Sequence, residues 1–387
     1  MLSLRRRFAF GVLALAGMAG LASSGKIIAQ DKDKKDDVPD TVLSFPTSDG
    51  LAIGAMWYPA KDKQSADAVM MFPRPGGVVN KQMIELAEAL QAKGFAVLLF
   101  DFRGCGMNGP APKGKEPLPD PFYLKGRGER ILADGSQFFA DQFNKGSFQR
   151  ATVEKVGLNY KTFGDRQKDA IYNDLQAARF FLDRKNDSRV CNTNRIWIVT
   201  EKEGYQTALG FIAIEAHRNT IFPEQNVAAV IDPTKAAKDY AGIVAFSPNE
   251  NSVVAGIQIN RGLKNLIDPD TKSAVEHIDR RMAIVSVYGK TEGPGKSKAI
   301  VNRWVTGSDD ELKRKFKYFV EVDNSKMKGT PTGFDMMDAA DSAGIKTKLV
   351  DQLTNIAKVG QDFGKDDTKR NASETKLIPR SPVMTSR

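Results

Sequence analysis

Three residues of this chain carry side chains that could act as nucleophiles near expected strand ends: Lys202, Cys105 and Ser247. An amine, a thiolate or a hydroxyl attacks a carbonyl group only when a base or a suitable environment activates it. Histidine is the usual base, and the chain has only His217 and His277. The chemistry that these residues would allow is acyl transfer by an unusual nucleophile.

The sequence around each of these residues weakens its case as a nucleophile. Lys202 is flanked by Glu201 and Glu203, and nearby negative charge favours the ammonium form, so a structural salt bridge is the better interpretation. Cys105 has no histidine close in sequence that could activate it. Ser247 precedes a proline, which is typical of a turn that follows a strand.

The sequence carries no signal for a cofactor or a metal. The Gly289 to Gly295 stretch does not match the phosphate-loop pattern, because its lysine follows the first glycine and no Gly-Lys-Ser/Thr closes it. Cys105 and Cys191 have no Cys or His partner at metal-ligand spacing. We therefore expect neither a cofactor nor a metal ion.

The first 30 residues read as an export signal. Arg5, Arg6 and Arg7 precede an apolar run from Phe8 to Leu21, which is shorter than the roughly 18–20 residues that span a bilayer. The arginines also resemble a twin-arginine signal. We expect a periplasmic or secreted protein with no transmembrane segment in the mature chain, after cleavage near residues 22–30.

Charge excludes a nucleic-acid-binding role. Of the net charge of +10, four positive charges and no acid lie in residues 1–29, which leaves +6 for the remaining chain. No compact basic cluster with interleaved aromatic residues is present. Since the 387 residues are 41% hydrophobic, the mature chain can bury a large core.

Strand and helix patterns alternate along residues 41–360. Asn80 is expected to cap a helix, and Cys105 and Cys191 fall at opposite ends of a parallel sheet, too far apart for a disulfide. The predicted strands are 42–45, 51–58, 68–72, 95–100, 195–199, 242–246, 282–288 and 318–322, and the predicted helices follow Asn80 and Asp169 and cover 204–216 and 346–358.

Three segments depart from this alternation. Residues 110–166 are rich in Lys, Gly, Pro and aromatic residues, and we interpret them as an inserted lid, partly helical around Arg130 to Phe143, or as a long surface loop. Residues 31–40 form a polar linker. Residues 361–387 lack apolar periodicity and are expected to be a disordered tail.

Four segments in order resemble the α/β-hydrolase superfamily, specifically its serine-hydrolase and dienelactone-hydrolase-like members. Residues 72–77 (Phe-Pro-Arg-Pro-Gly-Gly) are similar to the oxyanion loop, and residues 101–106 to the family's Asp-x-Arg-Gly-His-Gly. Residues 200–204 match the nucleophile elbow, and 287–289 the strand end before the catalytic acid. The resemblance implies a mostly parallel sheet with helices on both faces.

The departures from the family pattern fall on the chemistry. The resemblance places Lys202 at the nucleophile, Glu292 at the acid and Lys328 at the histidine. A Ser-His-Asp mechanism needs all three groups. His217 and His277 both lie far from the expected catalytic edge, so neither is expected to replace the triad histidine. All three triad positions are therefore substituted together.

Two interpretations remain. In the first, the chain is an exported pseudoenzyme whose crevice binds a small molecule or a protein; in the second, it is an active esterase or peptidase that uses Ser247 or Cys105. The residues expected to line the crevice are Arg74, Gly76, Gly77, Cys105, Glu201, Glu203, Tyr205 and Ser247.

Overall fold

The computed structural model describes residues 41–47, 51–60, 66–109, 129–131, 137–139, 158–217, 239–249, 283–292, 295, 299, 317–325, 327–338 and 346–355. All of them belong to the compact unit Pro39–Arg387. The expected export signal, the polar linker and the polar tail lie outside the described residues. No helix within the described ranges is long and apolar enough to cross a membrane.

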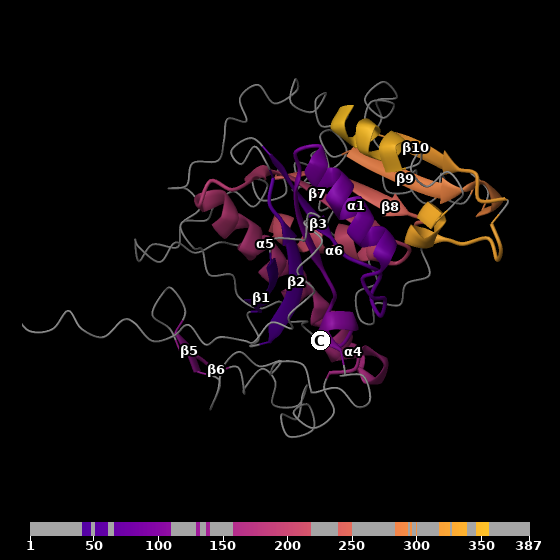
Figure 1. Ribbon diagram of the computed structural model, residues 1–387. Coiled ribbons are helices and arrows are strands. Elements are labelled where there is room, and N and C mark those ends of the chain that lie inside the picture. The colour runs from indigo at the N-terminus through magenta and orange to yellow at the C-terminus, as the bar shows by residue number, and fades with distance from the viewer. Residues whose placement is uncertain are drawn as a thin grey trace, which may run out of the picture. The chain divides into compact units, whose positions relative to one another are not determined.

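One eight-stranded sheet organises these residues (Figure 1). Strand β2 runs antiparallel to both of its neighbours, and the pairs from β4 to β10 are all parallel. This topology confirms the predicted mostly parallel sheet of an α/β-hydrolase-like fold. In spatial order the strands are β1 (Thr41–Pro46), β2 (Ala52–Tyr58), β4 (Ala96–Phe100), β3 (Asp67–Met71), β7 (Asn192–Glu201), β8 (Tyr240–Phe246), β9 (Ala283–Gly289) and β10 (Lys317–Val322).

The central strands are continuous apolar runs because both of their faces are covered. Every residue of β3, β4 and β9 is buried. Alternate residues contribute to separate cores: in β7, Ile196 and Ile198 face one cluster, while Trp197 and Val199 face the other. A shift of one residue in strand register would exchange the two faces, so the core fixes the register.

Helices cover both faces of the sheet (Figure 1). On one face lie α5 (Ile171–Asp187) and α6 (Gly204–His217), and on the other lie α1 (Lys81–Ala92) and a helix at 346–355. The Asn80 side chain accepts a hydrogen bond from the Met83 amide at 3.0 Å, which confirms the predicted cap. The short elements are η1 (Gly106–Asn108), η2 (Tyr160–Thr162), α4 (Asp165–Asp169), η5 (Lys290–Glu292) and η6 (Gly333–Asp338).

The insert differs from the expectation where the structure describes it. β5 (Glu129–Ile131) and β6 (Gln137–Phe139) form an antiparallel pair, so the helix expected around Arg130 to Phe143 is wrong for these six residues. The sequence between them contains Asp134-Gly135, a turn signal that favours a hairpin over a helix. At the end of the insert, the Tyr160 amide donates to the Gly104 carbonyl at 3.0 Å, which ties this segment to the loop after β4.

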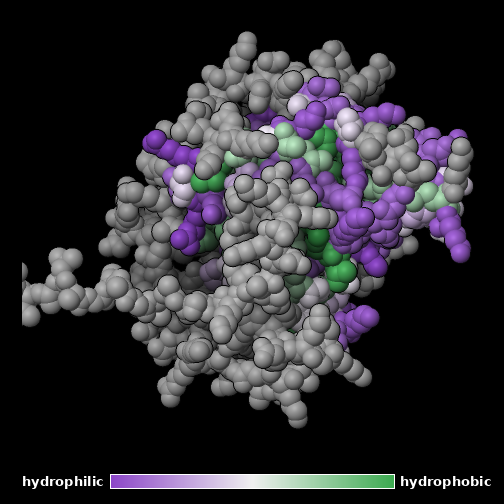
Figure 2. Space-filling view, viewed as in Figure 1, coloured by the Kyte–Doolittle hydropathy of each residue, from purple (hydrophilic) through white to green (hydrophobic). Residues whose placement is uncertain are grey.

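Both cysteines are free and buried, as predicted from their positions relative to the sheet. The described surface is mostly hydrophilic on the side that Figure 2 shows. Among the described residues, Val78 is the one large hydrophobic side chain that is exposed, with 54% of its surface accessible. Val78 lies in the loop after β3, at the carboxyl edge of the sheet.

Candidate functional site

Lys202 lies in the sharp turn between β7 and α6, where the sequence predicts a nucleophile elbow, and we call residues 200–204 the elbow. Lys202 adopts φ 46°, a left-handed conformation that costs a non-glycine residue about 1–2 kcal/mol. Its amide donates to the Phe246 carbonyl at 2.8 Å, and its carbonyl accepts from the Tyr205 amide at 3.2 Å. A Cβ on Gly204 would lie 1.9 Å from the Thr200 Oγ1, so α6 can start this close to β7 only with glycine there.

Glu201 anchors the loop that follows β10. Its Oε2 accepts a hydrogen bond from the Phe334 amide at 3.0 Å. Burial raises the pKa of the Glu201 carboxyl, while the Phe334 amide and the Lys202 charge act against that shift. Gly333 has φ 70°, and a Cβ there would lie 2.0 Å from the Glu201 Oε2 and 3.0 Å from the Lys202 Cε. The elbow and the loop after β10 are therefore in direct contact.

Glu203 connects the elbow to two neighbouring segments. Its Oε1 accepts from the Asn249 Nδ2 at 3.1 Å, and its Oε2 lies 4.0 Å from the Arg74 Nη1 in the loop after β3. The Arg74 side chain is 45% exposed. A pair this long and this exposed contributes at most about 1 kcal/mol, so Arg74 can exchange Glu203 for a ligand at little cost.

Ser247 is the most heavily hydrogen-bonded hydroxyl at this edge. It also adopts a left-handed conformation, with φ 47°, directly after β8. Its Oγ donates to the Glu292 Oε1 at 2.6 Å and accepts from the Gly333 amide at 2.8 Å. Ser247 is buried, with 5% of its surface exposed. Ser247 therefore joins the ends of β8 and β9 to the loop after β10.

Asn324 occupies the start of the loop where the family resemblance expects a histidine. Its Oδ1 accepts from the Thr291 amide and hydroxyl at 3.1 and 2.9 Å, and its Nδ2 donates to the Pro331 carbonyl at 3.1 Å. A Cβ on Gly289 would lie 2.1 Å from the Asn324 Nδ2. Lys328 lies farther along, exposed in a turn, and no described contact joins it to Lys202 or Glu292.

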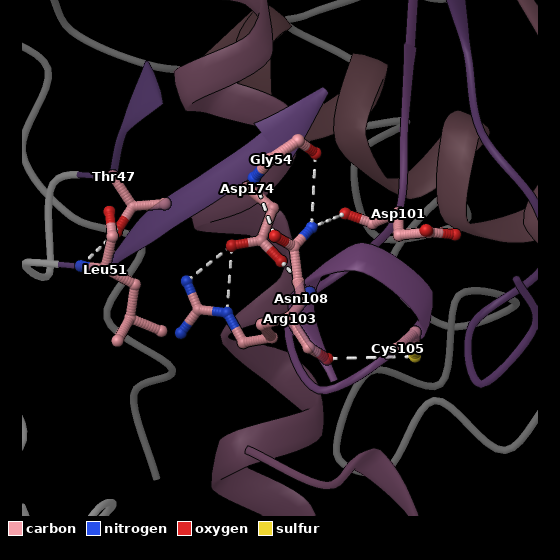
Figure 3. A network of polar contacts seen from close by, with 8 residues as sticks. All are labelled: Thr47, Leu51, Gly54, Asp101, Arg103, Cys105, Asn108 and Asp174. Carbon is pink, nitrogen blue, oxygen red and sulfur yellow. Dashed lines mark hydrogen bonds and ion pairs between the residues drawn. The ribbon is translucent and has the colours of Figure 1, made fainter. Parts of the chain in front are cut away.

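The two loops on the other side of the elbow are held by Asp101. Its carboxylate accepts from the Val79 amide at 2.6 Å and from the Met107 amide at 2.9 Å. Burial raises the pKa of Asp101 to about 6, against the effect of these two amides. The Asn108 Nδ2 donates to the Asp101 carbonyl at 2.7 Å (Figure 3). Asp101 thus joins the loop after β3 to the loop after β4.

Arg103 has a structural role in the same loop. Its guanidinium donates to the Asp174 Oδ1 at 2.9 and 2.7 Å, and its amide donates to the Asp174 Oδ2 at 2.9 Å (Figure 3). Neither side chain is accessible to solvent. This pair fixes the loop after β4 to α5, and it accounts for an arginine in the 101–106 segment without a role in chemistry.

Cys105 and Tyr205 are both buried. Burial raises the pKa of the Cys105 thiol to about 12, although the Gly76 amide acts in the opposite direction, so the thiol is protonated at neutral pH. Tyr205 is fully buried within the core on the α6 side of the sheet. Gly76, at φ 80°, is exposed, and Gly77 is half-buried with its amide donating to the Arg74 carbonyl at 2.8 Å.

Neither histidine is described at this edge. His217 is the last residue of α6, about 20 Å along the helix from the elbow. His277 lies outside the described residues. Within the described part of the chain, no three His, Cys, Asp or Glu residues group as metal ligands would.

Three residues that organise this edge were not predicted from the sequence: Asn324, Gly333 and Phe334. They join the loop after β10 to Thr291, Ser247 and Glu201, respectively. The positive-φ glycine Gly333 has a recognisable signal, because it follows a Pro-Thr pair in a short polar loop. Asn324 had no signal beyond its place after a strand.

Comparison with known proteins gives matches among solved structures only. No protein-family model matches the chain, and no curated protein matches it. The DcsB structure, a complex with its substrate analogue, is 13% identical, with a TM-score of 0.43, over 83% of this chain and 99% of that chain. Esterase 2 of Thermogutta terrifontis, phosphoramylated by tabun, is 12% identical (TM-score 0.41, covering 82% and 94%).

A third match is similar in extent. The α/β hydrolase GrgF from Penicillium sp. sh18 is 13% identical, with a TM-score of 0.41, over 82% of this chain and 97% of that chain. The strand order, with β2 alone antiparallel and the crossover between β3 and β4, is a property of this chain itself. On that topology, the chain has an α/β-hydrolase-like fold.

Proposed function

We propose that this protein is an exported, non-catalytic α/β-hydrolase-fold protein, a pseudoenzyme whose carboxyl sheet edge binds a small molecule or a protein. One observation carries the proposal. Lys202 occupies the left-handed position between β7 and α6, where a serine hydrolase of this fold presents its nucleophile. The backbone geometry of the elbow is retained, and the hydroxyl is not.

The charges around Lys202 support a structural role for its amine. Glu201 and Glu203 flank it in sequence, and Glu201 interacts with its charge. Glu292, at the position that the resemblance gives to the acid, accepts a hydrogen bond from the Ser247 hydroxyl and makes no described contact with Lys202.

The loop after β10 supports the same conclusion. Residues 323–335 contain no histidine. The backbone amides of Gly333 and Phe334 donate to Ser247 and Glu201, and the Phe334 ring packs 4.6 Å from that of Phe246. This segment therefore occupies the side of the elbow from which a base would approach.

The exposed part of the edge offers a surface for a ligand. In the loop after β3, Arg74 and Val78 are exposed, and Gly76 between them is exposed as well. A guanidinium beside an apolar side chain suits a ligand with an acidic group next to an apolar surface. We assign no cofactor, no metal ion and no nucleic acid to this function.

A hydrolase that uses Ser247 is the alternative. The 2.6 Å hydrogen bond from its Oγ to the Glu292 carboxylate is the observation in its favour. In such a reaction, the Oγ would attack an ester carbonyl carbon while Glu292 takes the hydroxyl proton. Glu292 would pass that proton to the alcohol as the ester bond breaks, and water would then release the acid from Ser247. Cys105 is a weaker candidate, because a thiol with a pKa of about 12 supplies almost no thiolate at neutral pH.

A fluorophosphonate probe separates these two functions. The chain from residue 31 to 387 is incubated with the probe and its intact mass is measured. We expect no adduct on the folded wild-type protein and no ester turnover from Lys202→Ser. A stoichiometric adduct that Ser247→Ala abolishes would establish the hydrolase alternative and refute the non-catalytic proposal.

Export is tested separately. The full chain is expressed in a bacterial host, and the mass of the protein recovered from the periplasm is compared with that of the whole-cell protein. We expect a periplasmic form that has lost about 22–30 residues, as a signal peptide predicts. Full-length protein confined to the cytoplasm would refute export and leave the proposal for the sheet edge unaffected.

A further inference from the structure

A cavity of about 280 Å³ lies between α5 and the end of the edge strand β1 (Figure 1 labels both elements). This volume is just below the roughly 300–1,000 Å³ of ordinary ligand pockets, so it suits a small molecule. Three strands separate β1 from β7, which places the cavity about 19 Å along the sheet from the elbow. It is a different location from the edge described above.

Aromatic rings make the inner wall of the cavity. The rings of Phe45 and Phe181 both line it, with centroids 5.8 Å apart and planes inclined by 32°. Phe181 also packs edge-on against Trp57 at 5.5 Å. Ala177 lies one helical turn before Phe181, and its single methyl group leaves the space that a larger side chain would fill. The wall is therefore formed before any ligand arrives.

The outer part of the cavity is cationic. The Lys185 ammonium lies 5.8 Å from the centroid of the Trp57 ring and 5.2 Å from that of Phe181, and these contacts hold it near the cavity. Arg184 contributes a second positive charge, and the Ser44 hydroxyl is a further donor. None of the nine lining residues is acidic.

We propose that this cavity binds a small amphipathic anion, in which a single carboxylate is attached to an aromatic or short aliphatic body. The body would lie against Phe45 and Phe181 in the space beside Ala177. The carboxylate would accept hydrogen bonds from Lys185 and Arg184. Two cations without an acidic partner in the lining favour an anion, and the aromatic wall favours an apolar body over a fully solvated one.

Three ligands of nearly equal shape test the charge requirement. Binding of 3-phenylpropanoate, 3-phenylpropanol and 3-phenylpropylamine to the folded chain is measured by titration calorimetry. We expect the carboxylate to bind at least about tenfold more tightly than the alcohol, and the amine not to bind, because the ligand's charge meets two cations. Equal affinity of acid and alcohol, or no binding of the acid, would overturn the proposal.

Two variants and a control locate the site. Lys185→Met keeps the stem and removes the charge, so it is expected to weaken carboxylate binding by about tenfold. Ala177→Leu fills the space and is expected to abolish binding while the urea midpoint of unfolding stays unchanged or rises. Lys328→Met, in the turn after β10 at the opposite end of the sheet, removes the same single charge and should bind as the wild type does.

The variants also define what would refute the location. Wild-type affinity in either Lys185→Met or Ala177→Leu would show that the carboxylate binds elsewhere. If Ala177→Leu lowers the unfolding midpoint instead, Lys185→Met and Arg184→Met together decide the question, because both side chains lie at the outer part of the cavity. Neither outcome bears on the fluorophosphonate experiment, so the two proposals fail independently.

Discussion

Replacing Gly333 by alanine tests whether the loop after β10 is locked onto the elbow. Gly333 has φ 70°, and its missing Cβ is what allows the Glu201 carboxylate to approach the loop. Gly329 in the same loop provides a matched control, because it has φ 81° and nothing lies within 4 Å of where its Cβ would be. Both substitutions strain the backbone alike, and only one of them meets Glu201.

The structure gives the expected magnitudes. A left-handed alanine costs about 1–2 kcal/mol, partly offset by about 0.4–1 kcal/mol from the reduced entropy of the unfolded chain. Gly329→Ala should therefore destabilise by about 1 kcal/mol. Gly333→Ala must also displace the Glu201 carboxylate and break its hydrogen bond from the Phe334 amide, which leaves a partly buried carboxylate without this donor. That adds about 1–3 kcal/mol.

Two measurements check this difference. Equilibrium unfolding in urea gives the free energy of unfolding of the wild type and of both variants. Hydrogen exchange at the Phe334 amide should accelerate by about 5- to 150-fold in Gly333→Ala and little in Gly329→Ala. If the two variants are equally stable and exchange at the same rate, the loop is not locked by Glu201, and our account of the elbow is wrong.

Three further predictions concern buried groups: the Arg103–Asp174 pair, Asp101 and the two cysteines. Arg103→Met should lower the free energy of unfolding, measured in urea, by about 3–5 kcal/mol because it leaves Asp174 buried and unpaired. Adding Asp174→Leu should recover part of that loss. An Arg103→Met variant as stable as the wild type would contradict this prediction. Burial raises the pKa of Asp101 from 3.8 to about 6, so the contribution of its protonated form to stability is complete below pH 4 and is lost as pH rises through 6. Relative to Asp101→Asn, the free energy of unfolding of the wild type should fall by about 3 kcal/mol over this range. The same pH dependence in both proteins would refute this prediction. Iodoacetamide at pH 8 should not modify Cys105 or Cys191 in the folded protein, because both thiols are buried and burial raises their pKa values to about 12. After denaturation, two adducts should appear in the mass spectrum.

Local sequence signals were sufficient for the elements of the fold. The apolar runs of β3 and β4 predicted strands covered on both faces, because a half-exposed strand would alternate. Asn80 predicted the start of α1 because its side chain can accept from an unpaired amide of the first turn. The elbow at Lys202 was predicted from a strand, a short polar turn and a helix with small residues at its start.

The insert and the edge contacts lay beyond local signals. The β5–β6 pair was missed because aromatic residues at 138 and 139 suit either a helix or a strand, and only the pairing of Glu129 with Phe139 decides between them. From the sequence, Ser247 could be interpreted either as a nucleophile or as part of a turn that follows a strand. Its bond to Glu292 joins residues 45 positions apart, and no pattern within either segment encodes it.

The sequence by itself determined the strands, their covered faces, a sharp turn at Lys202 and the absence of a histidine from residues 323–335, because each depends on the types and spacing of neighbouring residues. The tertiary structure decided how the ends of β7, β8, β9 and β10 meet. There, Gly333 approaches Glu201, and Asn324 accepts a hydrogen bond from Thr291. At the other end of the sheet, the structure also decided that Phe45 of β1 packs against Phe181 of α5 beside Ala177. Such contacts join segments that are distant along the chain, and their energies exist only once the sheet has brought its edges together.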